Sequence, residues 1–183
     1  RFIDACLREL PERYKLQCHA TDSRYLLNIM KVRDVEALIE ESCNLGSRRY
    51  PVDYKYSGYF IDIFTVERSR KSFLNIANLA TKALLAFKYI IKAPGWMVNI
   101  FYGLNQVVFA FFRLLNKILP KGNYCYHTYG SLFKSRRVEA ELIPPVEYIF
   151  EGKKYFVPNN SDAYLRRIYG DYMQLPPMAQ QKP

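Results

Sequence analysis

The chain reads Phe150-Glu-Gly-Lys-Lys-Tyr-Phe-Val-Pro158 near its C-terminal end and continues into Ala163-Tyr-Leu-Arg-Arg-Ile-Tyr-Gly-Asp-Tyr-Met-Gln-Leu-Pro-Pro177. In the first segment, Glu151-Gly152 separates two runs of aromatic and β-favouring residues, 148–150 and 155–157. Two such runs around a short turn that contains glycine predict a β-hairpin.

A short helix is expected directly after this hairpin. Polar side chains that can cap a first turn come first, and apolar residues at helical spacing follow them. Gly170 suits the left-handed conformation that ends many helices, and the proline pair at 176–177 forbids continuation. The capping residues are Asn160, Ser161 and Asp162, and the apolar face comprises Tyr164, Leu165 and Ile168.

A second segment, Ser57-Gly-Tyr-Phe-Ile-Asp-Ile-Phe64, carries one aspartate inside an apolar run. Together the two segments resemble the LicD family, bacterial enzymes that transfer phosphocholine or a similar phospho-alcohol from a CDP-linked donor to cell-surface glycans. The resemblance covers about residues 1–177. It implies a nucleotidyltransferase-like α+β fold with a mixed sheet, a long helical pair inserted and a C-terminal hairpin plus helix, in one domain over residues 1–183.

For the chemistry, the resemblance implies a metal-dependent phosphotransferase that uses Mg²⁺ or Mn²⁺, with Asp62 as a catalytic residue and metal ligand. The donor would be CDP-choline or another CDP-alcohol. The acceptor would be a lipid-linked glycan of lipopolysaccharide or a teichoic acid precursor, which implies a cytoplasmic protein at the inner face of the membrane. Because no Asp-x-Asp pair occurs in the sequence, the main metal ligands are expected upstream of Arg1, and the chain alone is expected to be inactive.

Asp62 is also a candidate functional residue on physical grounds. Large apolar side chains precede and follow it, a pattern typical of a strand inside a core. An isolated carboxylate there loses its hydration, which costs several kcal/mol unless a cation lies against it. A metal ion would supply that cation. A salt bridge to an arginine, or a position at a strand end in contact with solvent, explains the residue without any catalytic role.

The net charge of +10 comes from one part of the chain. Residues 68–138 contain twelve lysines and arginines and no acidic residue, whereas the rest of the chain is nearly neutral. Such a segment attracts phosphates of nucleotides, lipids or polymers. The simpler interpretation is that the basic side chains of this segment are solvated surface charges. The same interpretation applies to two basic residues near the end of a predicted strand. The candidate phosphate-binding side chains are Lys31, Arg33, Lys134, Arg136 and Arg137.

Between the termini the pattern alternates between short strands and loops. The first ten residues predict a helix, residues 14–18, 24–32 and 58–66 predict strands, and 43–55 predict a loop. Residues 35–39 form either a further strand or, extended to 41, a short helix. His127, in a tyrosine-rich connector over 122–131, offers a general base, although it has no partner in sequence.

Residues 73–119 predict two long helices that are separated at Ala93-Pro94-Gly95. The second is unusually apolar, and a bilayer span needs about 20 such residues. Three interpretations stay open: a helical pair buried in the protein, a hairpin lying on a membrane surface, and a transmembrane span. A buried helical pair or a hairpin on the membrane surface would still allow peripheral membrane contact through residues 73–119.

Several classes of protein are disfavoured. The sequence has no phosphate-binding P-loop, dinucleotide fingerprint or nucleophile elbow. Its four cysteines are scattered, so neither a zinc site nor a disulfide framework is indicated. Because it also lacks a nucleic-acid-binding motif, nucleic acid is not an expected partner. The alternatives to a transferase are a non-catalytic module that binds polyanions and a membrane-associated scaffold.

Overall fold

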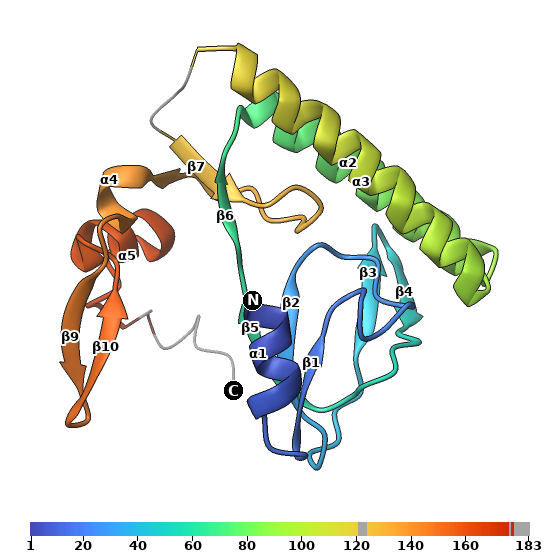
Figure 1. Cartoon of the computed structure of the whole chain (residues 1–183), viewed down its shortest axis with the longest axis horizontal. Helices are drawn as coiled ribbons and strands as arrows, with labels where there is room; N and C mark the ends of the chain where they lie inside the picture. The colour runs from blue at the N-terminus through green and yellow to red at the C-terminus, as the bar shows by residue number, and fades with distance from the viewer. Residues whose placement is uncertain (121–123, 176, 178–183) are drawn as a thin grey trace.

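The computed structural model describes residues 1–120, 124–175 and 177. These residues form an α+β structure of helices and short antiparallel strands (Figure 1). The helices are α1 (Phe2–Glu9), α2 (Lys71–Ile90), α3 (Gly95–Ile118), α4 (Glu139–Leu142) and α5 (Ser161–Tyr169). The strands are β1 (Tyr14–Gln17), β2 (Met30–Asp34), β3 (Ser42–Leu45), β4 (Arg48–Pro51), β5 (Tyr59–Ile63), β6 (Val66–Arg68), β7 (Tyr124–His127), β8 (Arg137–Val138), β9 (Val146–Phe150) and β10 (Lys153–Val157).

The strands form four small sheets with the orders β1-β2-β5, β3-β4, β6-β7-β8 and β10-β9. Every strand pair among the described residues is antiparallel. The α+β class expected from the sequence is therefore present, but the expected mixed sheet is not. α2 and α3 lie in sequence between β6 and β7, which pair with each other, so the helical pair is a long excursion from one small sheet.

The C-terminal hairpin and helix match the expectation. Lys153 pairs with Phe150 across a two-residue turn in which Glu151 and Gly152 have φ of 49° and 75°, the left-handed values that such tight turns require. The Asn160 side chain caps α5 by accepting a hydrogen bond from the Ala163 backbone N–H at 3.0 Å. Gly170 follows the helix with φ of 71°, so the helix ends before the proline pair, of which Pro176 lies outside the described residues.

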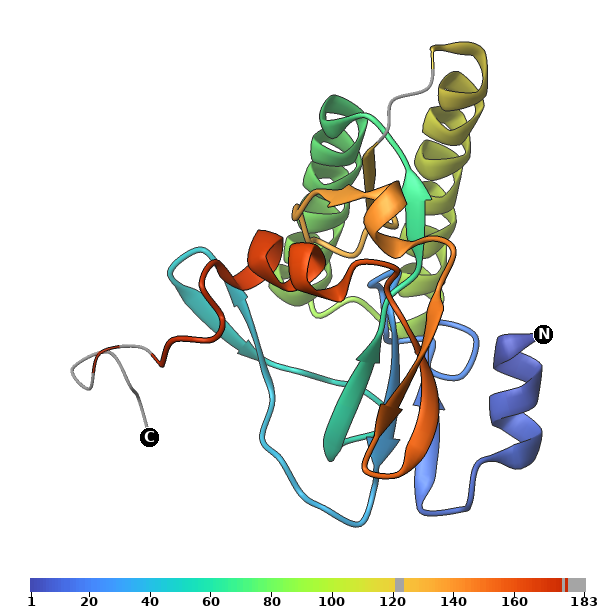
Figure 2. The same ribbon diagram turned by 90° about the vertical axis from the view of Figure 1, so that its left-hand side faces the viewer.

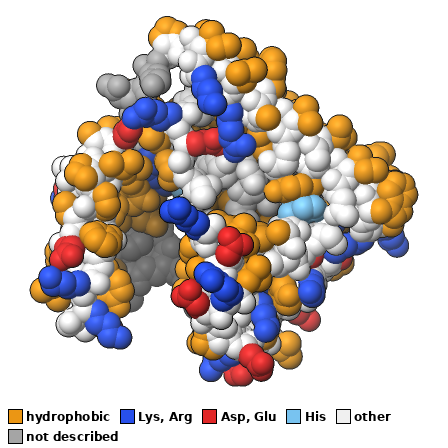
Figure 3. Space-filling view, viewed as in Figure 1, with side chains coloured by type: hydrophobic (Ala, Val, Ile, Leu, Met, Phe, Trp, Pro, Cys, Tyr) orange, Lys and Arg blue, Asp and Glu red, His pale blue; other side chains and the backbone are white. Residues whose placement is uncertain are grey.

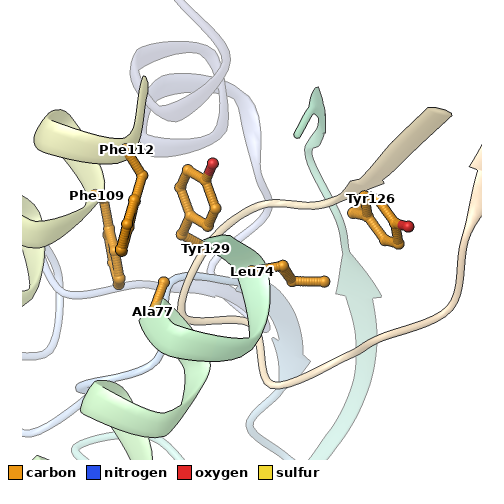
Figure 4. Packing of buried hydrophobic residues seen from close by; sticks show 6 residues of the cluster. All are labelled: Leu74, Ala77, Phe109, Phe112, Tyr126 and Tyr129. Atoms are coloured by element: carbon orange, nitrogen blue, oxygen red, sulfur yellow. The ribbon is translucent and has the colours of Figure 1, made fainter. Parts of the chain in front are cut away.

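α2 and α3 are the predicted helical pair, and they lie side by side above the sheet β1-β2-β5 (Figure 2). At one end their inner faces pack against β7 and the residues after it, in a cluster of Leu74, Ala77, Phe109, Phe112, Tyr126 and Tyr129 (Figure 4). At the other end, a second cluster joins Leu85, Val98 and Phe101 to Leu26 and Ala93.

The outer face of this pair is uncovered, so only the inner faces match the interpretation of a helical pair buried in the protein. Large apolar side chains on that face are half exposed or more: Ile76, Leu79, Phe87, Ile90, Trp96, Ile100, Leu104, Val107, Phe111, Leu114 and Ile118. Within the part of the chain that the structure describes, α3 is the one helix long and apolar enough to cross a membrane, and 28% of its most apolar window is buried. By length and composition alone this is weak evidence for a span.

The N-terminal half departs from the predicted strands. Residues 24–29 are not part of a strand, because the buried Asp22 carboxylate accepts hydrogen bonds from the Gln17 side chain and the Arg24 and Lys55 backbones and holds the chain in turns. Residues 35–41 form neither the predicted strand nor the rival helix. The predicted loop over 43–55 contains most of the hairpin β3–β4.

The predicted strand 58–66 is divided between two sheets, because β5 pairs with β2 whereas β6 pairs with β7. β5 is an edge strand, and Ile61 is 72% exposed. The expectation that this strand runs through a core was therefore wrong. Gly58, just before it, has φ of 124°, and a Cβ there would lie 1.9 Å from the Asp34 carbonyl oxygen, so only glycine fits this approach of the two strands.

Candidate functional site

Asp62 lines a cavity of about 440 Å³ between the sheet β1-β2-β5, the hairpin β3–β4 and the loop after β7. Cross-strand pairing of β2 and β5 places Asp62 directly opposite Lys31. The wall is mostly aromatic and aliphatic, with a few polar groups. The residues around the cavity are Tyr25, Leu27, Ile29, Lys31, Glu41, Ser42, Cys43, Asn44, Val52, Tyr54, Phe60, Asp62, Ser131, Leu132 and Phe133.

Lys31 is the cation expected beside the Asp62 carboxylate from the apolar sequence around it. Its Nζ lies 3.2 Å from Asp62 Oδ1 and 3.0 Å from the centre of the Phe60 ring. Burial lowers the pKa of Lys31, and the negative charge of Asp62 partly opposes that shift. The carboxylate is therefore held by a salt bridge, to a lysine rather than to the arginine considered from the sequence.

Two buried oxygens in this cavity have no hydrogen-bond partner among the described residues: Tyr25 Oη and Asp62 Oδ1. Lys31 approaches Asp62 Oδ1 as an ion pair without the alignment of a hydrogen bond. Burial, together with the nearby Tyr54 and Asp62, raises the pKa of Tyr25, so its hydroxyl stays neutral and keeps a proton to donate. An unsatisfied buried polar group costs about 1–3 kcal/mol. The cavity thus presents one free donor and one charged acceptor to whatever enters it.

A divalent metal ion does not fit these residues by themselves. No group of three or more metal-ligating side chains occurs in the described part of the chain. The cavity contains two carboxylates, Asp62 and Glu41, and Glu41 is paired with Arg33. Mg²⁺ and Mn²⁺ favour octahedral sites built from several oxygens. No chemical step through a metal ion is therefore derived.

Arg33 is not available as a phosphate ligand. It lies within β2, not at a strand end, and its side chain is fully buried. Its Nε donates to Gln17 Oε1 at 2.6 Å, its Nη1 donates to the Gly58 carbonyl oxygen at 3.0 Å, and its guanidinium forms a two-point ion pair with Glu41. Arg33 instead ties β1, β2 and the start of β5 together.

The other three candidate phosphate ligands do not form one cluster. Lys134 is exposed and lines no cavity described here. Arg136 lies over the Tyr124 ring, 3.9 Å from its centre, and lines a second cavity. Arg137 is buried and donates from Nη2 to His127 Nε2 at 3.2 Å. Only Lys31 accompanies Asp62.

His127 is a buried residue of β7 and not part of a polar loop. An arginine side chain can only donate hydrogen bonds. His127 Nε2 must therefore accept the hydrogen bond from Arg137, which keeps the imidazole neutral. Burial and the positive charge of Arg137 lower the pKa of His127 to about 4. It lines neither the Asp62 cavity nor the cavity beside Arg136.

Sequence reasoning missed Tyr25 and Tyr54 as members of the site. Tyr25 lies in a run predicted to be a strand, and Tyr54 lies in a run predicted to be a loop. Neither has a motif or spacing that distinguishes it from the other tyrosines of the chain. Their shared position arises only from tertiary packing, in which their rings meet edge to face at 5.1 Å.

No protein-family model, no curated protein and no solved structure matches the chain. The case for a function therefore depends on the sequence motifs and the geometry of the cavity.

Proposed function

We propose that the chain is part of a LicD-like phosphotransferase and that its CDP-linked donor, CDP-choline or another CDP-alcohol, binds in the cavity beside Asp62. The single observation that carries the proposal is that one cavity holds the unpartnered buried Tyr25 hydroxyl beside the Asp62–Lys31 ion pair. Buried polar groups normally have partners, so a bound polar ligand accounts for the Tyr25 hydroxyl. The aspartate also belongs to the motif that resembles the family.

The side chains suit the two halves of such a donor. Lys31 provides a buried positive charge for the diphosphate, and the Tyr25 hydroxyl can donate a hydrogen bond to a phosphate oxygen. Aromatic walls at Tyr54, Phe60 and Phe133 can pack against a base or a cationic alcohol.

In the proposed transfer, an acceptor hydroxyl oxygen bonds to the phosphorus that bears the alcohol. The bond between this phosphorus and the bridging oxygen breaks, and CMP leaves with the electron pair. Asp62 is the carboxylate positioned to take the hydroxyl proton. The glycan or teichoic acid precursor that would supply the hydroxyl is part of the same proposal.

The test is calorimetric titration of the chain with CDP-choline, with and without Mn²⁺, because the resemblance implies a metal. We expect binding to the wild-type chain and an affinity at least about tenfold lower in Asp62→Asn and in Tyr25→Phe, each of which removes a polar contact to the ligand. Asp162→Asn is the matched control, since Asp162 also pairs with a cation, Arg166, but lies on α5. Absence of binding by the wild-type chain, or equal affinity in Asp62→Asn, would refute the proposal.

A specific observation supports a second role, contact with an anionic membrane surface. The outer face of α2 and α3 exposes a continuous series of large apolar side chains (Figure 3), and the segment around them has no acidic residue. Lys82 and Lys117 are exposed on the same helical pair, and Lys92 is exposed in the turn that joins the two helices. Apolar side chains next to lysines favour insertion among anionic lipids.

Vesicle sedimentation tests this second role. We expect the chain to pellet with vesicles that contain phosphatidylglycerol and to pellet much less with phosphatidylcholine alone. Leu104→Lys/Val107→Lys should weaken binding at least about tenfold, because it removes two inserting side chains although it adds positive charge. Leu38→Lys, at a side chain that is exposed away from the helices, is the control. Stronger binding by the double variant would mean that charge alone attracts the chain, and equal binding to both lipids would also contradict the role.

A further inference from the structure

A second cavity, of about 370 Å³, lies where α2 begins and α3 ends. Its lining shares no residue with that of the Asp62 cavity. Among the residues that the structure describes, no carboxylate lines it. Figure 3 shows basic side chains gathered over this end of the helical pair. The lining consists of Arg68, Ser69, Arg70, Lys71, Asn116, Pro120, Tyr124, Tyr126 and Arg136.

Most of the basic side chains around this cavity form no salt bridge with a described carboxylate. Arg68 is the exception, because its Nε donates to Glu139 Oε2 at 2.6 Å. Arg70 donates to the Pro120 carbonyl oxygen at 3.2 Å, and Arg136 lies over the Tyr124 ring. Neither guanidinium forms a salt bridge with a described carboxylate, although Arg167 and, more weakly, Arg136 lower the pKa of Glu141. Lys71 has no ion-pair partner within the described residues. Cations held together around a cavity repel one another, and an anion placed between them relieves that repulsion.

Tyr126 adds a hydroxyl group to the wall of the cavity. Its side chain is 4% exposed, and its ring packs with the cluster of Phe109, Phe112 and Tyr129. Figure 4 shows its hydroxyl pointing away from those aromatic rings. The hydroxyl makes no hydrogen bond to any described residue, although the residue lines the cavity. A hydroxyl at the wall of a cavity that makes no bond to the protein can donate to an acceptor oxygen of a ligand.

The start of α2 adds donors of the same kind. The helix is 20 residues long, its first turn has no acidic residue, and no side chain caps it. Its first backbone N–H groups have no acceptor within the helix. Such groups favour anions.

From the cationic lining and the Tyr126 hydroxyl together, we propose that this cavity binds a phosphate or diphosphate group. Guanidinium groups at Arg70 and Arg136 match phosphate oxygens in a two-point geometry, and Lys71 adds a point charge. The site is separate from the donor site proposed above. The phosphate can belong to a soluble compound or to a lipid headgroup, since the same side chains would recognise either.

The soluble source is tested by calorimetric titration with pyrophosphate at physiological salt. We expect wild-type binding, an affinity at least about tenfold lower in Arg70→Gln/Arg136→Gln, and a smaller loss in Tyr126→Phe. Arg48→Gln/Arg49→Gln is the matched control, because it removes the same charge from exposed positions on β4 that line neither cavity. Thermal melting of each variant shows whether it is folded. If the double arginine variant does not fold, the nearly isosteric Tyr126→Phe still tests the site.

The lipid source is tested in parallel with phosphatidic acid vesicles against phosphatidylcholine vesicles. Vesicle binding without pyrophosphate binding, lost in Arg70→Gln/Arg136→Gln and kept in Arg48→Gln/Arg49→Gln, supports a headgroup ligand. Absence of both interactions, or equal losses in the two double variants, overturns the proposal. Arg70→Gln/Arg136→Gln should leave CDP-choline binding unchanged, so a failure of this site is distinguishable from a failure of the donor site.

Discussion

At the scale of single residues, His127 gives a clear pH prediction. Its folded-state pKa of about 4 lies below the ordinary value of 6.5 because of burial and the Arg137 charge. Between these values the unfolded chain binds a proton that the folded chain does not, so stability falls as the pH drops from 7 to 5. We expect His127→Gln to reduce this loss by about 2 kcal/mol, measured by urea unfolding at both pH values. Some loss should remain, because burial also lowers the pKa of His19. An unchanged pH dependence in the variant would contradict the assignment.

The same scale shows where sequence reasoning about side chains works. The apolar neighbours of Asp62 correctly indicated that it needs a cation, but they could not identify Lys31, which becomes its neighbour only when β2 pairs with β5. Arg33 shows the opposite error. Its position near a predicted strand end indicates a solvated charge or a phosphate ligand, but tertiary packing surrounds it with Gln17, Glu41 and Gly58.

At the scale of secondary-structure elements, Glu67 of β6 joins three parts of the chain. Its carboxylate accepts hydrogen bonds from the Arg113 guanidinium of α3, the Thr128 hydroxyl and the Tyr129 backbone N–H. These bonds lower its pKa although burial alone would raise it. We expect Glu67→Gln to lower the free energy of unfolding by about 2 kcal/mol, because a charged acceptor with several donors is lost. Glu147→Gln, which removes one exposed ion pair on the hairpin, is the control and should change little. Equal stabilities of the two variants in chemical denaturation would contradict this role.

The elements that the sequence predicted are those with local signals. The turn at Glu151-Gly152, the cap at Asn160 and the break at Ala93-Pro94-Gly95 each act within a few residues, and the hairpin, α5 and the helical pair followed from them. The division of residues 58–66 into β5 and β6 has no local cause. It depends on pairing with β2 and β7, which are distant in sequence.

At the scale of the whole molecule, Asp53 connects the helical pair to the N-terminal half. Its Oδ1 lies 2.6 Å from the buried Lys88 Nζ of α2, and its Oδ2 accepts a hydrogen bond from Arg24 Nε at 2.7 Å. We expect Asp53→Asn to destabilise the fold by about 3 kcal/mol, because it leaves the Lys88 charge buried without its partner. Asp53→Asn/Lys88→Met should recover much of that loss, and a double-mutant cycle by chemical denaturation measures the coupling. Additive losses in the cycle would contradict it.

The whole-molecule arrangement was the least predictable feature. Composition and periodicity supported the α+β class, but the assembly of small antiparallel sheets depends on contacts between residues far apart in sequence. The Asp62 cavity is a product of that assembly, since β2, β5, the hairpin β3–β4 and the loop after β7 all contribute to its wall. Its motif residue could be predicted, whereas its tyrosines could not.

The most direct measurement of the central claim is a crystal structure of the chain soaked with CDP-choline. The account predicts nucleotide density in the cavity, with phosphate oxygens in contact with Lys31 Nζ and the Tyr25 hydroxyl and with Asp62 facing the ligand. An empty cavity with Tyr25 still unpartnered, or a nucleotide bound only elsewhere on the molecule, would contradict it.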